Sequence, residues 1–208
     1  MGQTLESFQF NNKSTLFAVA SVNEIFFYNL DSIEHFKQQL KLSDEESSNI
    51  KANHVQKIAW LQDNKSIICL CYEIDYNPNS MAATRVFIYN VETKVERKWR
   101  TWTEHVKKGE IVVSERGDWV AVIMRKFLKK NHYSTVIQIG NLLRTDDPIE
   151  ISSVEIKEVI GNVNWDFKSN KFAIIHEDES TRRGINVKHV VEFYQIVTKG
   201  KKLDLVKI

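Results

Sequence analysis

One short stretch combines the two residue types that contact RNA, MRKFLKKNHY at positions 124–133. Its cations and interleaved aromatic rings are Arg125, Lys126, Phe127, Lys129, Lys130 and Tyr133. Lysine and arginine neutralise phosphates, and aromatic rings stack on exposed bases. The pattern therefore predicts contact with RNA, although a long solvated hairpin without a ligand explains the same residues.

A second basic cluster follows at Arg182, Arg183 and Lys188, and we expect it to extend the same surface. That surface is not uniformly basic, because an acidic loop lies around Asp44–Glu46. The whole chain carries a net charge of only +2, from 29 basic and 27 acidic residues. Any contact with nucleic acid must then come from a local patch, and protein partners remain equally open.

Four of the tryptophans divide into two classes. Trp99 and Trp102 lie in RKWRTWTEH, on a weak outer strand where we expect more exposure. An exposed aromatic ring beside arginine is typical of an interface anchor, so both are candidate partner-binding residues, with packing as the alternative. Trp60 and Trp165 instead occupy equivalent apolar positions in an internal repeat, which predicts that they pack in the core.

Catalytic and metal-binding motifs are absent from the sequence: it has no nucleophile elbow, P-loop, dinucleotide fingerprint or H-E-x-x-H zinc motif. HEDE at 176–179 is the best carboxylate and imidazole cluster, and a solvated loop explains it better. Cys69 and Cys71 would lie on one face of a strand about 7 Å apart, which suits buried thiols and not a disulfide. We therefore expect no enzyme activity, cofactor, metal or small-molecule substrate.

An internal repeat organises the rest of the chain. Each unit begins with two apolar residues that are separated by one other residue. A polar turn and a second apolar run follow. The second of the two apolar residues, here called the anchor, is Phe10, Trp60, Val113 or Trp165. Successive anchors are 50, 53 and 52 residues apart. Self-similarity at such a regular period indicates a repeat architecture.

Two further runs complete each unit. The third runs are EIFFYNL, RVFIYNV, TVIQIGNL and VVEFYQIV, and the weaker fourth runs include VERKWRTW, IEISSVEI and KLDLVKI. Only residues 31–46 favour a turn or two of helix. Four short strands per unit predict an all-β, WD40-like β-propeller, with antiparallel four-stranded blades. The approximate blades are 1–52, 53–104, 105–157 and 158–208. A β-sandwich of hairpins, which needs no regular period, is the alternative.

The blades depart from typical WD40 blades, because the Gly-His and Trp-Asp signatures are missing. Propellers usually have about four to eight blades, so we expect residues 1–208 to be a single segment of a larger ring. Insertions in repeat proteins gather on a binding face, and loops on a rigid scaffold carry function. The longer loops expected on one face of the blades are 43–54, 72–84, 125–134 and 177–189.

The repeats also carry a family resemblance. VEIKEVIGNVNWDFKSNKFAIIHEDE, followed by VVEFYQIVTKGKKLDLVKI, resembles the propeller of the b subunit of eukaryotic translation initiation factor 3. The matching features are the EIKE lead-in, the anchor Trp165, the second strand ending at His176, the Phe193–Tyr194 pair and the lysine-rich turn at 199–202. HVQKIAWLQDNKSIICLCYE and RGDWVAVIMRK align in the same order, so the resemblance runs through all four repeats.

This resemblance implies a non-enzymatic scaffold in translation initiation. Its partners would be other subunits of initiation factor 3 and the small (40S) ribosomal subunit, including ribosomal RNA. It also implies further blades, an RNA-recognition domain and a helical tail outside residues 1–208. The sequence has no signal peptide or long apolar run, so we expect a cytoplasmic protein that contacts no membrane. A generic cytosolic propeller adaptor and the related propeller of initiation factor 2A are the alternatives.

Overall fold

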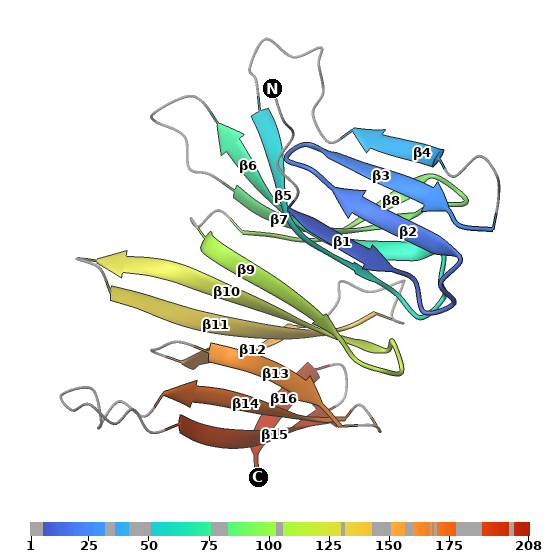
Figure 1. The fold of residues 1–208 in the computed structure, drawn as a ribbon. Coiled ribbons are helices and arrows are strands. Elements are labelled where there is room, and N and C mark those ends of the chain that lie inside the picture. The colour runs from blue at the N-terminus through green and yellow to red at the C-terminus, as the bar shows by residue number, and fades with distance from the viewer. Residues whose placement is uncertain are drawn as a thin grey trace. The chain divides into compact units, whose positions relative to one another are not determined.

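The computed structural model describes most of the chain. The described residues are 6–31, 36–41, 51–75, 83–102, 106–129, 132–142, 151–156, 160–166, 168, 170–177, 189–199 and 202–208. Within this part of the chain there are sixteen β-strands and no helix (Figure 1). The strands form four antiparallel sheets of four strands each, and in every sheet consecutive strands are neighbours. The predicted all-β, four-stranded units are thus confirmed.

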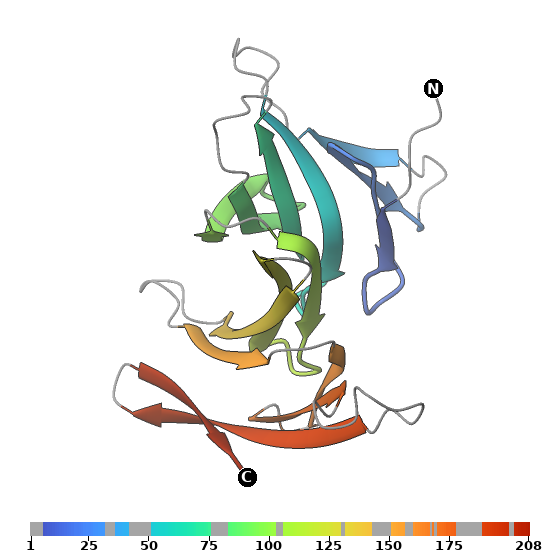
Figure 2. The ribbon, with the colours of Figure 1, turned by 90° about the vertical axis from the view of Figure 1, so that its left-hand side faces the viewer.

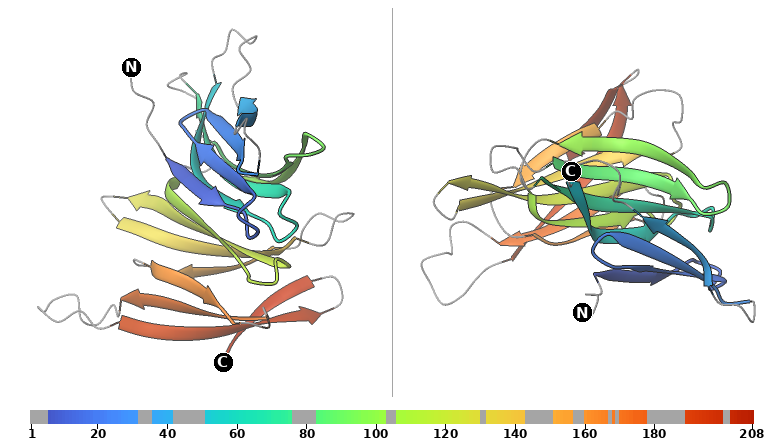
Figure 3. Two further views of the ribbon diagram at one scale, coloured as in Figure 1. Left: turned by 45° about the vertical axis from the view of Figure 1, so that its right-hand side comes forward. Right: turned by 90° about the horizontal axis from the view of Figure 1, so that it is seen from above.

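The first two sheets come from the N-terminal half of the chain. The first consists of β1 (Ser7–Phe10), β2 (Leu16–Ala20), β3 (Glu24–Asn29) and β4 (Phe36–Lys41). The second consists of β5 (Lys51–Trp60), β6 (Ser66–Asp75), β7 (Ala83–Asn90) and β8 (Val95–Trp102). Both sheets have the twist expected of antiparallel strands and can be followed from other sides in Figures 2 and 3.

The other two sheets come from the C-terminal half. The third consists of β9 (Val106–Val113), β10 (Trp119–Lys129), β11 (His132–Asn141) and β12 (Ile151–Ile156). The fourth consists of β13 (Ile160–Trp165), β14 (Lys171–Glu177), β15 (His189–Lys199) and β16 (Lys202–Lys207). The chain divides within β9 into two compact units, residues 1–111 and 112–208, and each is described by itself.

The helical turn expected in 31–46 is wrong where the structure describes that stretch. FKQQLK is strand β4, which pairs with β3 from Glu24–Lys41 to Tyr28–Phe36. Glutamine, leucine and lysine favour helices, but intrinsic propensity is weak and tertiary pairing overrides it. A fourth strand completes the first sheet in the same way as in the other three.

The turn between the first and second strand is built the same way in every sheet. The amide of the residue after the anchor donates a hydrogen bond of 2.8–3.0 Å to the carbonyl of the residue that begins the second strand. The four donor–acceptor pairs are Asn11–Leu16, Leu61–Ser66, Ser114–Trp119 and Asp166–Lys171. These donors are separated by the same 50, 53 and 52 residues as the anchors, which confirms the predicted period.

The same turn requires a left-handed backbone at one position. In the first three sheets this residue is Ser14, Asn64 or Gly117, with φ of 55°, 57° and 73°. Its amide donates to the carbonyl of Asn11, Leu61 or Ser114 and closes the turn. Glycine adopts this conformation without a steric penalty, and asparagine tolerates it better than most residues.

Each sheet has a front, the side that carries the anchor, and a back, the opposite side. In residues 1–111 the back of the first sheet packs on the front of the second. The ring centroid of Phe27 lies 6.2 Å from that of Trp60 and 5.9 Å from that of Tyr89. Other buried members of this core are Leu16, Ala18, Ala20, Ile25, Val55, Ile58, Ile67, Cys69, Cys71, Phe87 and Val91.

In residues 112–208 the back of the third sheet packs on the front of the fourth. Phe172 is central, with its ring centroid 5.3 Å from that of Trp165 and 5.4 Å from that of Tyr194. The third sheet contributes Ala121, Ile123, Ile137 and Ile139, and the fourth adds Val163, Ile174 and Ile196. The two units therefore repeat one mode of packing, the back of one sheet on the front of the next.

Candidate functional site

The stretch predicted to contact RNA is a paired hairpin and not a loop. β10 continues to Lys129 and β11 begins at His132. Arg125 pairs with Thr135, and Phe127 pairs with Tyr133. The sequence predicted a loop over 125–134, and lysine is depleted in strands. The missed signal is the aromatic pair Phe127 and Tyr133, which the backbone register places opposite each other, because aromatic residues at such positions favour antiparallel pairing.

The structure describes the predicted basic residues only in part. The backbones of Arg125, Lys126 and Lys129 lie in β10, and that of Tyr133 lies in β11. The remaining residues predicted to bind RNA lie outside the described part of the chain: Lys130, Arg182, Arg183 and Lys188. The joint basic surface therefore stays a prediction, while the hairpin that would carry its central residues is described.

The expected exposure of the outer strand β8 is wrong for Trp99. Its side chain is 8% exposed, and its indole Nε1 has no hydrogen-bond partner among the described residues. The strand register explains the burial: Arg100 pairs with Val86 and Lys98 with Phe87, so Trp99 is the extra residue of a β-bulge. Trp102 ends β8, and its side chain is not among those described. Partner binding by either tryptophan stays a prediction.

The two anchor tryptophans pack in the core as predicted. Trp60 is buried, and its indole N–H donates to the carbonyl oxygen of Gln9 at 2.9 Å. Trp165 is half-buried, and its indole N–H donates to the carbonyl oxygen of Val112 at 3.2 Å. In both cases the acceptor is the residue before the preceding sheet's anchor. The anchor thus joins consecutive sheets by a hydrogen bond as well as by apolar contact.

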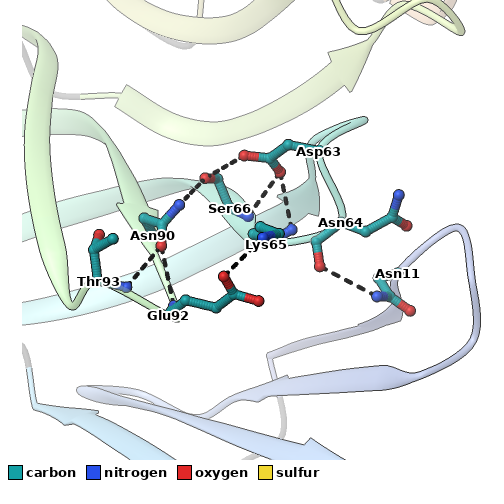
Figure 4. Close-up of polar contacts among 8 residues, drawn as sticks. All are labelled: Asn11, Asp63, Asn64, Lys65, Ser66, Asn90, Glu92 and Thr93. Atoms are coloured by element: carbon teal, nitrogen blue, oxygen red, sulfur yellow. Dashed lines mark hydrogen bonds and ion pairs between the residues drawn. The ribbon is translucent and has the colours of Figure 1, made fainter.

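A polar network joins the short turns of the first and second sheets (Figure 4). The side-chain amide of Asn11 donates to the carbonyl of Asn64 at 3.3 Å, and the backbone amide of Lys13 donates to Oδ1 of Asn64 at 3.1 Å. A carboxylate oxygen of Asp63 accepts from the backbone amides of Lys65 and Ser66. These bonds satisfy backbone donors of the turns and fix their shape, so the network is structural.

The longer loops of the second sheet open at the opposite ends of its strands from this network. Because the four strands form an antiparallel meander, the β5–β6 and β7–β8 turns lie at the same end of the strands. The β6–β7 connection joins the opposite ends. Strands extend into the loop predicted at 72–84, since β6 continues to Asp75 and β7 begins at Ala83.

His176, the histidine of the HEDE stretch, lies near a carboxylate on another strand. Its Nε2 is 3.4 Å from Oε1 of Glu192. Lys207 donates a hydrogen bond to the same Oε1, and the Tyr194 hydroxyl donates to Oε2 at 2.6 Å. Burial alone would raise the pKa of Glu192, but the hydrogen bonds from Lys207, Tyr194 and His176 outweigh it and lower this pKa to about 2. Burial, then the hydrogen bond to Glu192, raises the pKa of Tyr194.

Glu192 and Tyr194 are themselves poorly suited to proton transfer near neutral pH. A general acid or base works best when its pKa lies close to the working pH. Glu192 is ionised and weakly basic, and Tyr194 keeps its proton. The sequence places Glu192 and Tyr194 two residues apart on one strand, β15. It does not show that Lys207 and His176, on the neighbouring strands β16 and β14, lie beside them. The cluster holds three strands of the fourth sheet together.

Both cysteines are buried thiols of β6, as expected. Burial raises the pKa of Cys69 well above its ordinary value, and the neighbouring Cys71 raises it further. A thiol with a raised pKa is a poor nucleophile and a poor metal ligand at neutral pH.

In the described ranges, no three His, Cys, Asp or Glu side chains are grouped closely enough to hold a metal. No helix of the described residues is long and apolar enough to cross a membrane.

Comparison with known proteins supplies the fold and no sequence family. No protein-family model matches the chain, and no curated protein matches its sequence. Two solved structures resemble it at low identity. A puromycin hydrolase S511A mutant has a TM-score of 0.58 and 10% identity, over 80% of this chain and 26% of that one. The tricorn protease has a TM-score of 0.56 and 11% identity, over 98% of this chain and 22% of that one.

An oligogalacturonate lyase in complex with manganese is similar to the same degree. Its TM-score is 0.56 at 7% identity, over 96% of this chain and 51% of that one. The residues described here thus span 51% or less of each of these three chains. These proteins have propeller folds, and at such identities the likeness concerns the fold alone. The four antiparallel four-stranded sheets of this chain are blades of a β-propeller.

Proposed function

We propose that this chain is a non-enzymatic scaffold in translation initiation, a propeller segment like that of the b subunit of initiation factor 3. The observation that carries the proposal is the ordered sequence resemblance through all four repeats, strongest from Val154 to the end of the fourth blade. The strand positions support it, because Trp165, His176 and the Phe193–Tyr194 pair lie on β13, β14 and β15 of one sheet. We propose other subunits of this factor and the small ribosomal subunit as the partners, in the cytoplasm.

The proposed ribosome-binding element is the β10–β11 hairpin. Its basic stretch lies on strands that continue directly from the buried residues Val122 and Met124, so a rigid blade supports the cations. A rigid support lowers the entropic cost of binding a phosphate backbone.

A charge-reversal variant tests the ribosomal part of this proposal. We expect Lys129→Glu combined with Lys130→Glu to weaken binding to purified 40S subunits by about tenfold or more at low salt. It should also reduce the slope of log K against log salt by about two, one for each lost phosphate contact. The measurement is a binding titration at several salt concentrations.

The matched control is Lys199→Glu combined with Lys202→Glu. These two residues pair at the β15–β16 turn, and the variant changes the net charge by the same amount. Equal loss of binding in both variants would indicate a non-specific charge effect. If the wild-type chain does not bind 40S subunits and instead copurifies with another cytosolic complex, the initiation proposal fails and the adaptor alternative gains support.

A further inference from the structure

The outer strand of the second sheet, β8, forms an open sheet edge. In the described part of the chain it stands last in its strand order and pairs with β7 alone. Complete four-stranded repeats precede and follow it in the sequence, so the edge belongs to an internal blade. In an antiparallel pair, alternate residues direct their N–H and C=O groups away from the partner strand. β8 therefore presents backbone donors and acceptors to which a further strand can pair.

The open edge is regular over four residues. Residues 95–98 pair in one unbroken register with residues 90–87 of β7. The register then shifts at Trp99, and this bulge ends the regular stretch. Val95, at the other end, is an apolar side chain that is 59% exposed. The edge can therefore accept a short extended segment of about four residues, with an apolar contact at one end.

The acidic side chains beside this edge are already paired. Nζ of Lys65 lies 2.9 Å from Oε2 of Glu92 (Figure 4). Nη1 of Arg85, on β7, lies 3.7 Å from Oε1 of Glu96. The guanidinium of Arg85 also lies over the ring of Phe87, 4.8 Å from its centroid, which helps to hold it in place. The negative charges at the edge are thus compensated within the second sheet.

The cations of the same edge are not compensated. Lys94, Arg97 and Lys98 have no ionic partner among the residues that the structure describes, and both lysines are exposed. Lysine on an edge strand repels a second copy of the same edge, which prevents self-pairing. The same charges favour an acidic strand, because opposite charges directly across a strand pair stabilise it and like charges destabilise it.

We infer that residues 95–98 of β8 bind an extended acidic segment of a partner protein, which pairs antiparallel as a fifth strand of the second sheet. Antiparallel pairing continues the pattern of the sheet. From its N-terminal end, the segment places acidic residues opposite Lys98 and Arg97, a polar residue opposite Glu96 and an apolar residue opposite Val95. This contact is independent of the proposed binding of RNA by the β10–β11 hairpin.

A blocked peptide of sequence TEETVT is the probe for this contact. We expect it to bind residues 1–208 in a calorimetric titration and to slow hydrogen exchange at alternate backbone amides of β8. An added strand uses the N–H groups of one of its own edges only. Of two peptides N-methylated on the odd or on the even residues, one should bind like the parent and the other about tenfold more weakly or worse.

These peptides distinguish strand pairing from general attraction, because all three carry the same charge. A wild-type chain that does not bind TEETVT overturns the inference. Equal binding of the two N-methylated peptides also overturns it, since the contact is then purely electrostatic. A third contrary outcome is protection of the β8 amides by an oligouridylate that displaces TEETVT, which would make this edge a nucleic-acid surface.

A charge exchange tests the register. Lys98→Glu places like charges opposite each other and should weaken the binding of TEETVT about fivefold. Lys168→Glu, at an exposed lysine of the β13–β14 turn, makes the same change in net charge and should bind like the wild type. The peptide TKETVT carries lysine opposite position 98, so it should bind Lys98→Glu more tightly than it binds the wild type. Failure of this exchange contradicts the antiparallel register, and circular dichroism checks that both variants keep their strands.

Discussion

At the scale of single residues, the anchor tryptophans combine two stabilising contacts. Trp60 fills the space in front of the second sheet, beside the ring of Phe27, and its N–H satisfies the carbonyl of Gln9. One net hydrogen bond contributes about 0.5–1.5 kcal/mol, and a cavity in the core adds to the cost of removing the ring. The anchor therefore stabilises a blade contact more than an aliphatic residue of similar volume would.

Replacing each tryptophan by phenylalanine separates these contributions. We expect Trp60→Phe to lower the free energy of unfolding by about 2 kcal/mol, because Trp60 is buried and its hydrogen bond is short. Trp165→Phe should cost about 1 kcal/mol, because Trp165 is half-buried and its bond is longer. Urea denaturation followed by circular dichroism measures both. A larger loss in Trp165→Phe would contradict this order.

Glu192 gives the fourth sheet a defined dependence on acid. Its folded-state pKa of about 2 lies below the ordinary value of 4.5, so the unfolded state binds a proton first as the pH falls. The stabilisation is therefore complete above about pH 4.5 and is lost as the pH falls towards 2. We expect the wild-type chain to lose about 1–2 kcal/mol over this window beyond what Glu192→Gln loses.

The acid effect is measured by urea unfolding at several pH values between 2 and 5. Glu192→Gln should be less stable than the wild type at pH 7 and should approach it near pH 2. Glu115→Gln, in the exposed turn of the third sheet, is the control and should follow the wild-type curve. Parallel curves for the wild type and Glu192→Gln would show that the Glu192 cluster does not contribute.

At the scale of elements, the repeated turn is the most constrained feature. It combines a closing backbone hydrogen bond with a left-handed residue, as at Gly117. Gly117→Ala should lower the free energy of unfolding by about 1 kcal/mol, because a Cβ is disfavoured at a φ of 73°. Thermal unfolding measures the loss, and Glu115→Ala in the same turn should be nearly neutral. Equal stability of both variants would mean that the turn relaxes to another conformation.

The sequence predicts elements well where local chemistry determines them. Apolar alternation and the polar turns predicted the first three strands of each sheet and their period, because both are short-range signals. FKQQLK was misread as helical, since its strand character comes from pairing with β3. The burial of Trp99 depends on a one-residue bulge opposite Val86 and Phe87, and a register shift leaves no mark in the sequence.

The candidate site was less predictable for the same reason. The residue types in the basic stretch could be recognised directly, but the continuation of β10 to Lys129 depends on pairing with β11. The Glu192 cluster joins side chains from three strands, so no linear motif contains it. Distant residues meet only once the register of the sheet is set, and that register follows from packing.

At the scale of the whole molecule, four blades with one design account for the described residues. Each of the two described cores packs the back of one sheet on the front of the next. The same mode of packing therefore builds the apolar core of both units.

The order of the strands has a kinetic consequence. Every sheet consists of four consecutive strands, so its backbone pairing never reaches beyond one repeat of 50–53 residues. Short loops close quickly, and domains rich in local contacts fold faster than those that depend on distant pairing. Each sheet can form its hydrogen bonds as soon as its own repeat has left the ribosome, before the following repeat is translated. The apolar contacts of the first sheet with the second, and of the third with the fourth, form afterwards.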